Sequence, residues 1–231
     1  MAESIHKGHR ERVKKEFLEN GYDKHTPPHK ILETLLFFCL PQGDTNPLAH
    51  ELLERYGTIA DVLDAPVDEL ITFKGITPSN VVLFKLIPTV MRIYNSDKLN
   101  NSPNFQSLSD IGDYLLGQYV GITEENFSVV SLDGNARLIS FDILEKGDIG
   151  SVGVSTRKII QLLLKTRASC IVIAHNHPSG IALPSNADEA ITQSVASALS
   201  YINVRLLDHI IIADNDYISM AQSSKYKHLF E

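Results

Sequence analysis

The chain has 231 residues, of which 43% are hydrophobic, so it can bury one sizeable core or two modest ones. Its formal net charge of −7 at pH 7 argues against a nucleic-acid-binding surface over the whole protein. No stretch approaches the roughly 20 consecutive apolar residues of a membrane span, so we expect no membrane contact.

The start of the chain lacks the basic and then apolar pattern of a signal sequence. Cys39 and Cys170 both lie in apolar runs, which is typical of small buried thiols in a reducing compartment. Two cysteines are also too few for a cysteine-rich structural zinc site. We therefore expect a cytoplasmic protein without a disulfide.

The first part of the chain has the apolar periodicity of helices, interrupted by glycine and proline residues. Helices are predicted at 10–20, 29–40, 47–56, 59–63, 67–71 and 78–94. We predict an all-α domain over residues 1–95.

Around residues 73–80, a short helix meets a glycine-containing turn and a further helix. This pattern resembles a helix-hairpin-helix, in which backbone amides of the turn approach a DNA phosphate. The candidate DNA-contacting residues are Lys74, Gly75 and Thr77. Thr77 stands where the usual turn has its second glycine, so a hairpin of helices used only for packing or docking is the alternative interpretation.

Residues 7–15 form a basic run that also bears on DNA binding. Five Lys or Arg residues stand there against Glu11 alone, which gives a local charge of 5 − 1 = +4. Such a run either contacts a phosphate backbone or forms the solvated face of a helix.

Residues 96–104 are polar and contain a proline, which is typical of an interdomain linker. Residues 105–231 then alternate between helix and strand patterns. Helices are predicted at 109–119, at 156–166 and after Ser185, and strands at 126–132, 136–145, 169–174, 204–213 and 217–220. Asp133-Gly134 predicts a hairpin between the first two strands. The second domain is therefore expected to be α/β, with helices around a mixed sheet.

Two histidines and an aspartate stand at a spacing that suggests a metal site. The apolar, β-branched run 169–174 predicts a buried strand of parallel type that delivers His175 and His177 to its carboxyl end. Alternate residues of an extended chain point the same way, so these two imidazoles can share an ion while Asn176 points away. Ser185 is suited to cap the next helix, which places Asp188 in its first turn.

Three nitrogen and oxygen ligands are the number that a catalytic zinc uses while keeping a position open for water. We therefore predict Zn²⁺ held by His175, His177 and Asp188, in a hydrolase that activates water.

The segment His-Asn-His-Pro-Ser-Gly at 175–180, with Ser185 and Asp188, resembles the JAMM (MPN-plus) metalloprotease motif in its bacterial RadC form. Leu-Asp-His at 207–209, Gly-His-Arg-Glu-Arg at 8–12 and the segment 44–50 extend the resemblance over nearly the whole chain. It implies a JAMM/MPN-type mixed sheet flanked by helices, a three-layer arrangement like that of cytidine deaminases, after a RadC-type helical domain.

The resemblance also implies a function. Ser185 would help to stabilise a tetrahedral intermediate, and the substrate would be an amide bond of peptide or isopeptide type. The RadC name carries an association with DNA repair.

One position departs from the family pattern. The family takes its general base from a Glu on an earlier strand, and Asp142 occupies the matching position here. An Asp is one methylene shorter, and a misplacement of roughly 1 Å can cost about 10²-fold in rate. Three residues further, Glu145 is expected on the opposite face of the strand unless a bulge turns it back. Asp142 is therefore the expected base.

Three other functions compete with this hypothesis. The chain could be a catalytically weak, zinc-stabilised module that binds DNA or a repair or recombination partner. A zinc nucleobase deaminase needs His-x-Glu with Pro-Cys-x-x-Cys, and the sequence has neither. A strand that ends in Pro-Ser-Gly also does not match the ββα-metal hairpin of an HNH nuclease.

Overall fold

The computed structural model describes residues 8–98, 103–147 and 154–230. It divides into two compact units, residues 1–90 and residues 91–231. The division falls inside the helix Pro78–Lys98, a few residues before the linker expected at 96–104. Residues 96–98 of that expected linker are therefore helical. Part of that linker, residues 99–102, lies outside the described ranges.

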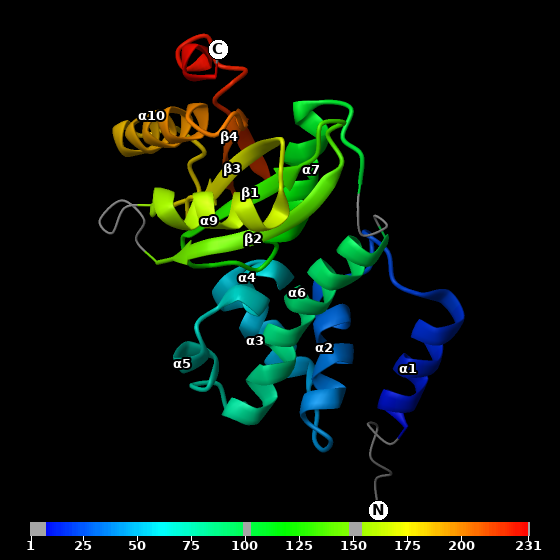
Figure 1. The fold of residues 1–231 in the computed structure, drawn as a ribbon. Helices are drawn as coiled ribbons and strands as arrows, with labels where there is room; N and C mark the ends of the chain where they lie inside the picture. Colours follow the sequence, from blue (N-terminus) through cyan, green and yellow to red (C-terminus); the bar gives the residue numbers. More distant parts are fainter. Residues whose placement is uncertain (1–7, 99–102, 148–153, 231) are drawn as a thin grey trace, which may run out of the picture. The chain divides into compact units, whose positions relative to one another are not determined.

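The first unit is helical, as predicted (Figure 1). Its helices are α1 (His9–Asn20), α2 (Pro28–Cys39), α3 (Asn46–Tyr56), α4 (Ile59–Asp64), α5 (Val67–Leu70) and α6 (Pro78–Lys98). Glycines with positive φ end two of them, Gly21 after α1 and Gly57 after α3. The buried apolar side chains of α2 to α6 form one core, with Leu32, Leu36, Leu52, Leu70 and Phe84 fully enclosed.

The second unit is a five-stranded mixed sheet with helices on both faces, which confirms the predicted fold class. Its elements are α7 (Leu108–Tyr119), β1 (Asn126–Leu132), β2 (Leu138–Lys146), α9 (Thr156–Thr166), β3 (Cys170–Asn176), α10 (Asn186–Ser200), β4 (Arg205–Ala213), β5 (Asp216–Ser219) and a 3₁₀ turn η1 (Lys227–Leu229). The strand order is β2-β1-β3-β4-β5.

β3 lies at the centre of this sheet and is buried along its whole length. It runs parallel to β4 but antiparallel to β1. The prediction of a strand of parallel type is therefore confirmed for one of its two neighbours. The hydrophobic run of β3 follows from this central position, because helices cover both of its faces.

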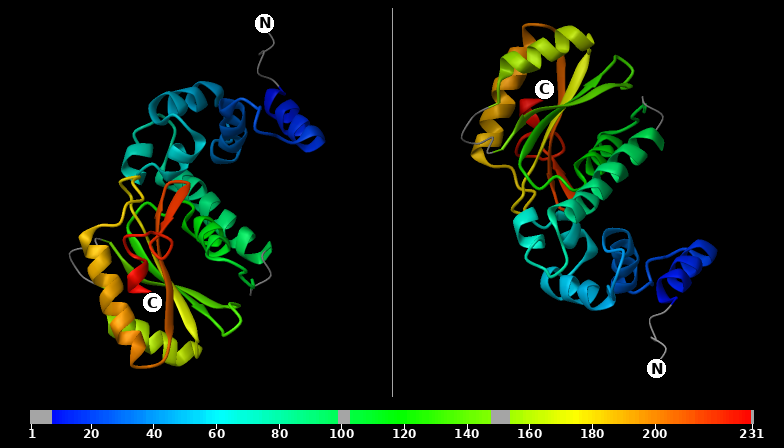
Figure 2. Two further views of the ribbon diagram at one scale, coloured as in Figure 1. Left: turned by 90° about the horizontal axis from the view of Figure 1, so that it is seen from above. Right: turned by 90° about the horizontal axis from the view of Figure 1, so that it is seen from below.

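Each face of the sheet has its own hydrophobic core. On one face, side chains such as Val130, Val172 and Ile210 pack against α7. On the other, Phe127 and Ile173 pack against α9 and α10. Figures 1 and 2 show α9 and α10 on one side of the sheet and α7 on the other.

The hairpin of β1 and β2 contains a bulge that changes which residues of β2 face α9. Ser128 pairs with Ile143, but Phe127 pairs with Glu145, so Leu144 is the extra residue. Directly opposed residues share a face of the sheet. Glu145 therefore points to the same face as Phe127, and so does Asp142 through its partner Val129.

Both cysteines are buried thiols, as expected. None of the helices within the described ranges combines the length and the apolar character that crossing a bilayer demands.

Candidate metal centre

Three potential ligand side chains converge at the carboxyl end of β3. The Nε2 atoms of His175 and His177 lie 2.9 Å apart. Asp188, in the first turn of α10, places Oδ1 3.0 Å from Nε2 of His175 and Oδ2 3.7 Å from Nε2 of His177. One donor atom from each residue lies within 4.8 Å of the others, so the three could hold a single metal ion.

The geometry and chemistry of these donors fit a tetrahedral ion. Metal–ligand bonds of about 2.0–2.1 Å place the ligand atoms of a tetrahedron about 3.3 Å apart. The 2.9 Å between the two Nε2 atoms is close to that value, and so are the distances to the two oxygens of Asp188, 3.0 Å from His175 to Oδ1 and 3.7 Å from His177 to Oδ2. The side chains of His175 and Asp188 are almost fully buried, whereas that of His177 is 19% exposed. The site therefore opens to solvent on the side of His177.

The strand geometry that the sequence predicts is present. His175 lies in the row of Phe127, on the face covered by α9 and α10. Asn176 points to the other face, where its Oδ1 accepts the N–H of Asn126 at 2.8 Å and its Nδ2 donates to the carbonyl of Glu124 at 2.9 Å. Asn176 thus anchors the end of β3 without approaching the ligands.

A chain of hydrogen bonds behind the site determines which nitrogen of His175 faces an ion. The Thr192 hydroxyl donates to the carbonyl of Asp188 at 2.6 Å, so it accepts from Nδ1–H of His209 at 2.7 Å. Nε2 of His209 then accepts from Nδ1–H of His175 at 2.9 Å. Nε2 is consequently the nitrogen of His175 that faces the site, where a metal would take the place of the proton through which Nε2 contacts Asp188.

The other two ligands are oriented in the same way. Nδ1–H of His177 donates to the carbonyl of Ile181 at 2.9 Å, which leaves Nε2 toward the site. Asp188 accepts two hydrogen bonds on Oδ2, each at 2.7 Å, from the backbone N–H and the hydroxyl of Ser185. These contacts form the predicted cap of α10.

The same surroundings set the protonation states. Burial by itself would raise the pKa of Asp188, but the hydrogen bond and charge of His175 and the donors of Ser185 hold this pKa well below its usual range. Burial and the neighbouring His175 lower the pKa of His209 well below 6.5. An ionised Asp188 and a neutral His209 are the states that metal binding needs.

Asp208, next to His209 in β4, is fully buried. Its oxygens accept from the hydroxyl of Ser219 at 2.5 Å and from the N–H groups of His209 and Ala221 at 2.7 and 2.8 Å. Burial outweighs these hydrogen bonds and raises the pKa of Asp208 to about 6. The hydrogen bonds of Asp208 to Ser219 and Ala221 connect β4 to β5 and to the segment after it, behind the site.

Two carboxylates of β2 lie on the metal face of the sheet. Glu145 stands in the same row as Phe127 and His175, two strands or about 10 Å away between Cα atoms. Asp142 lies in the next row on the same face, with Val129 and Ile173, two residues further from the carboxyl end of β3. Strict alternation would point Glu145 to the opposite face, but a bulge at Leu144 turns it back, which is the alternative that the sequence left open.

The environments of these two carboxylates differ. Glu145 forms an ion pair with Lys158 at the start of α9, at 2.9 Å. Oδ2 of Asp142 is buried and has no hydrogen-bond partner within the described ranges. Neither Asp142 nor Glu145 belongs to the group of three donors that could hold the ion.

The hydroxyl of Ser185 is engaged with Asp188, whereas a donor to an oxyanion has to point its O–H toward the substrate. Its hydroxyl donates to Oδ2 of Asp188 and accepts from the N–H of Asp188 at 3.2 Å. In this structure Ser185 therefore orients a ligand. Its hydroxyl has to leave Asp188 before it can donate to a developing oxyanion.

Sequence reasoning missed Thr192. The signal was present, because Thr192 follows Asp188 by four residues on α10 and so lies on the same face of the helix. A threonine at this position can form a hydrogen bond to the carbonyl four residues before it.

The predicted DNA-contacting residues lie together in the turn before α6. Gly75 has φ of +96°, which supports the predicted tight turn. The N–H of Thr77, however, donates to Oδ1 of Asn80 at 2.9 Å and is not free for a phosphate. Among the basic residues of α1, Arg10 binds the carbonyl oxygens of Leu40 and Gly43. Lys7 of the basic run lies outside the described ranges.

Comparison with known proteins agrees with the fold. The family described as the RadC-like JAB domain matches residues 105–226. A UPF0758 protein of Fusobacterium nucleatum is 33% identical over 229 residues, which cover 96% of this chain and 98% of that protein. A UPF0758 protein of Methylibium petroleiphilum is 35% identical over 193 residues (84% and 87%), and one of Pseudoalteromonas translucida is 32% identical over 212 residues (92% and 94%). The chain therefore belongs to the family of proteins with a RadC-like JAB domain.

Proposed function

We propose that this protein is a zinc-dependent hydrolase that cleaves amide bonds of peptide or isopeptide type. The observation that supports the proposal most directly is the convergence of His175, His177 and Asp188, each oriented by its own hydrogen bond. A site used only for stability would normally be closed by a fourth protein ligand, whereas three ligands leave a position for water or substrate.

A zinc ion held by these residues would lower the pKa of a water molecule toward 7 and polarise the scissile carbonyl. The protein itself then has to remove a proton from that water and return it to the leaving amine. Ser185 is proposed to donate to the developing oxyanion once its hydroxyl turns away from Asp188.

Asp142 and Glu145 are the two candidates for the proton transfer. Asp142 matches the family position and has an oxygen without a partner. Glu145 has the longer side chain, shares the row of His175, and forms an ion pair with Lys158. We propose that one of them is the base, and parallel Asp142→Asn and Glu145→Gln variants decide which. The base is the residue whose amide variant loses about 10²–10⁴-fold in turnover while the zinc content stays unchanged.

The function itself is tested by metal analysis and by activity on small peptide amides and isopeptide-linked substrates. Purified protein should contain about one zinc per chain, and His177→Ala should lose both the metal and the turnover. His25→Ala is the matched control, because His25 is an exposed histidine of the helical unit. Full turnover by metal-free His177→Ala would disprove the proposal.

A second candidate is a catalytically weak, zinc-stabilised module that binds DNA or a repair partner. The occupied hydroxyl of Ser185 and the ion pair of Glu145 favour it, since both groups are engaged within the protein. Under this proposal no variant of Asp142, Glu145 or Ser185 changes turnover. Zinc removal should instead lower the melting temperature. Binding to duplex DNA should weaken as the salt concentration rises.

A further inference from the structure

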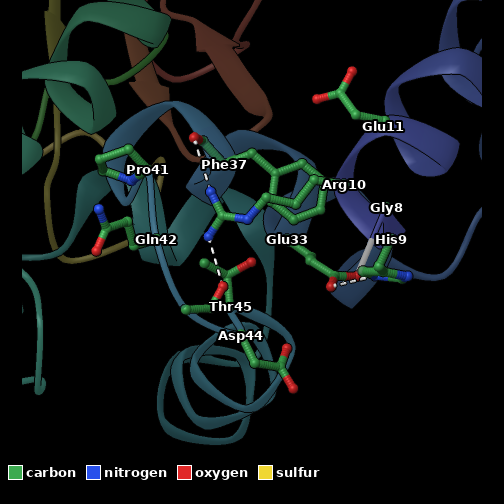
Figure 3. A pocket seen from close by; sticks show the side chains of 11 residues that line it. Gly8, His9, Arg10, Glu11, Glu33, Phe37, Pro41, Gln42, Asp44 and Thr45 are labelled. Atoms are coloured by element: carbon green, nitrogen blue, oxygen red, sulfur yellow. Dashed lines mark hydrogen bonds and ion pairs between the residues drawn. The ribbon is translucent and has the colours of Figure 1, made fainter. Parts of the chain in front are cut away.

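The helical unit contains a cavity that the proposed hydrolysis does not use. Its volume is about 650 Å³, within the range of small-ligand sites. It lies between the start of α1, the side of α2 and the loop before α3 (Figure 3). The segments 8–12 and 44–50, which resemble the family but contribute nothing to the metal site, both reach this cavity.

Glu33 places a buried carboxylate at the cavity wall. The residue is only 3% exposed. Oε1 lies 3.0 Å from Nε2 of His9, and Oε2 accepts from Nδ2 of Asn46 at 3.2 Å. A carboxylate can accept about four hydrogen bonds, so these two contacts leave acceptor capacity unused. His9, when protonated, forms an ion pair with Oε1, and a second cation near Oε2 would lower the cost of burying the negative charge further.

Thr45 adds a second buried polar group to the same wall. It is 2% exposed, and its hydroxyl has no hydrogen-bond partner among the residues that the structure describes. The side chain does not cap α3, because Oδ1 of Asp44 accepts the N–H of Asn46 instead. Buried hydroxyls are nearly always hydrogen-bonded in folded proteins, so a ligand that reaches this one would supply the missing partner.

Two basic side chains line the cavity, His9 and Arg10, and both already have partners there. Arg10 donates to the carbonyl oxygens of Leu40 at 2.5 Å and Gly43 at 2.7 Å, and its guanidinium lies 5.0 Å from the ring centre of Phe37. Figure 3 shows Arg10 beside Phe37, with Glu11 pointing away from Glu33. The cavity thus combines acceptor oxygens with an apolar wall.

We propose that this cavity binds an ammonium or guanidinium group carried on an aliphatic stem. The cationic group donates to Glu33 and to the hydroxyl of Thr45, and the stem lies against the ring of Phe37. Such a group occurs in free diamines and in the lysine or arginine side chains of a partner protein. The recognition chemistry is the same for both sources.

The test uses the full chain and four probes: cadaverine, agmatine, N-acetyl-lysine amide and 1,5-pentanediol. The diol has the length of cadaverine but no charge. Binding is followed by calorimetry and by the NMR shifts of residues around the cavity. Binding by cadaverine or agmatine supports a free amine, binding by the blocked lysine alone supports a partner side chain, and the diol should not bind.

The variants separate recognition from folding. Glu33→Gln keeps the shape and should weaken binding at least tenfold, while Glu54→Gln, an exposed change on α3, should leave it unchanged. Thr45→Val should weaken binding about fivefold while keeping or raising the melting temperature, since it removes a buried hydroxyl without a partner. If Glu33→Gln does not fold, Thr45→Val alone decides. The proposal is overturned if no cationic probe binds, if the diol binds equally well, or if folded Glu33→Gln or Thr45→Val binds like the wild type.

Discussion

The Nδ1 atom of His175 and the Nε2 atom of His209 lie 2.9 Å apart in the interior of the sheet unit, and this contact selects the nitrogen of His175 that faces a metal. His209 is fully buried and is itself held by Thr192. Residues behind a ligand commonly tune the affinity of a metal site in this way. The Leu-Asp-His segment therefore orients a candidate ligand without belonging to the group of three donors.

Replacing His209 should weaken zinc binding. In His209→Ala, Nδ1–H of His175 loses its acceptor, and the affinity should fall about 10–100-fold. His209→Gln should lose less, because its amide can accept from His175 and donate to Thr192. Competition with a chromophoric chelator measures both affinities.

His228→Ala is the matched control, since His228 is exposed in the 3₁₀ turn near the end of the chain. It should bind zinc like the wild type. Equal zinc affinity for His209→Ala and the wild type would show that the His175–His209 contact does not orient the ligand.

The metal triad could be predicted from the sequence because its geometry is local. Alternation along one strand places His175 and His177 together, and a helix cap three residues before Asp188 fixes the third ligand. The partners behind the ligands depend on strand order. His209 reaches His175 only because β4 pairs in parallel with β3, and a sequence pattern does not encode that neighbour.

Glu145 shows a second limit of sequence reasoning. Strict alternation assigns residues 142 and 145 to opposite faces, and a single extra residue in the β1–β2 ladder reverses the assignment. No glycine or proline marks the bulge at Leu144. Its position follows from the packing of the hairpin on α9, where Leu144 joins the core around Ile159.

The raised pKa of Asp208 predicts how stability depends on pH. An unfolded Asp titrates near 3.9, whereas folded Asp208 titrates at about 6. The folded chain therefore binds a proton more tightly than the unfolded chain. This contribution to the free energy of unfolding is fully present below pH ~4 and is lost as the pH rises through about 6. The shift of about 2 units corresponds to about 3 kcal/mol.

Asp208→Asn removes this dependence, because its amide stays neutral at every pH. The free energy of unfolding is measured by urea titration of metal-free protein at pH 4 and at pH 7.5. Between these conditions, the wild type should lose about 2 kcal/mol relative to Asp208→Asn, less than the full value because an unfolded Asp is already about half ionised at pH 4. A constant difference between the two proteins would mean that Asp208 titrates normally in the folded state.

Two glycines of α7 should respond in opposite ways to alanine. A Cβ built on Gly112 would lie 2.2 Å from Cζ of Tyr217, which packs on this helix from β5, whereas a Cβ on Gly117 would meet nothing within 4 Å. Gly117→Ala should raise the free energy of unfolding by about 0.5–1 kcal/mol, the usual helix-propensity gain. Gly112→Ala should lower it by about 1–3 kcal/mol, because the ring has to move.

The double variant Gly112→Ala/Tyr217→Leu tests the cause of that loss. A leucine does not extend to the position of Cζ, so the clash disappears and the alanine regains its helix-propensity advantage over glycine. In the Tyr217→Leu background, Gly112→Ala should therefore be neutral or stabilising, with a coupling energy of about 1–3 kcal/mol between the two positions. Additive effects of the two substitutions would instead place the cost of Gly112→Ala in the α7 backbone, away from the contact with β5.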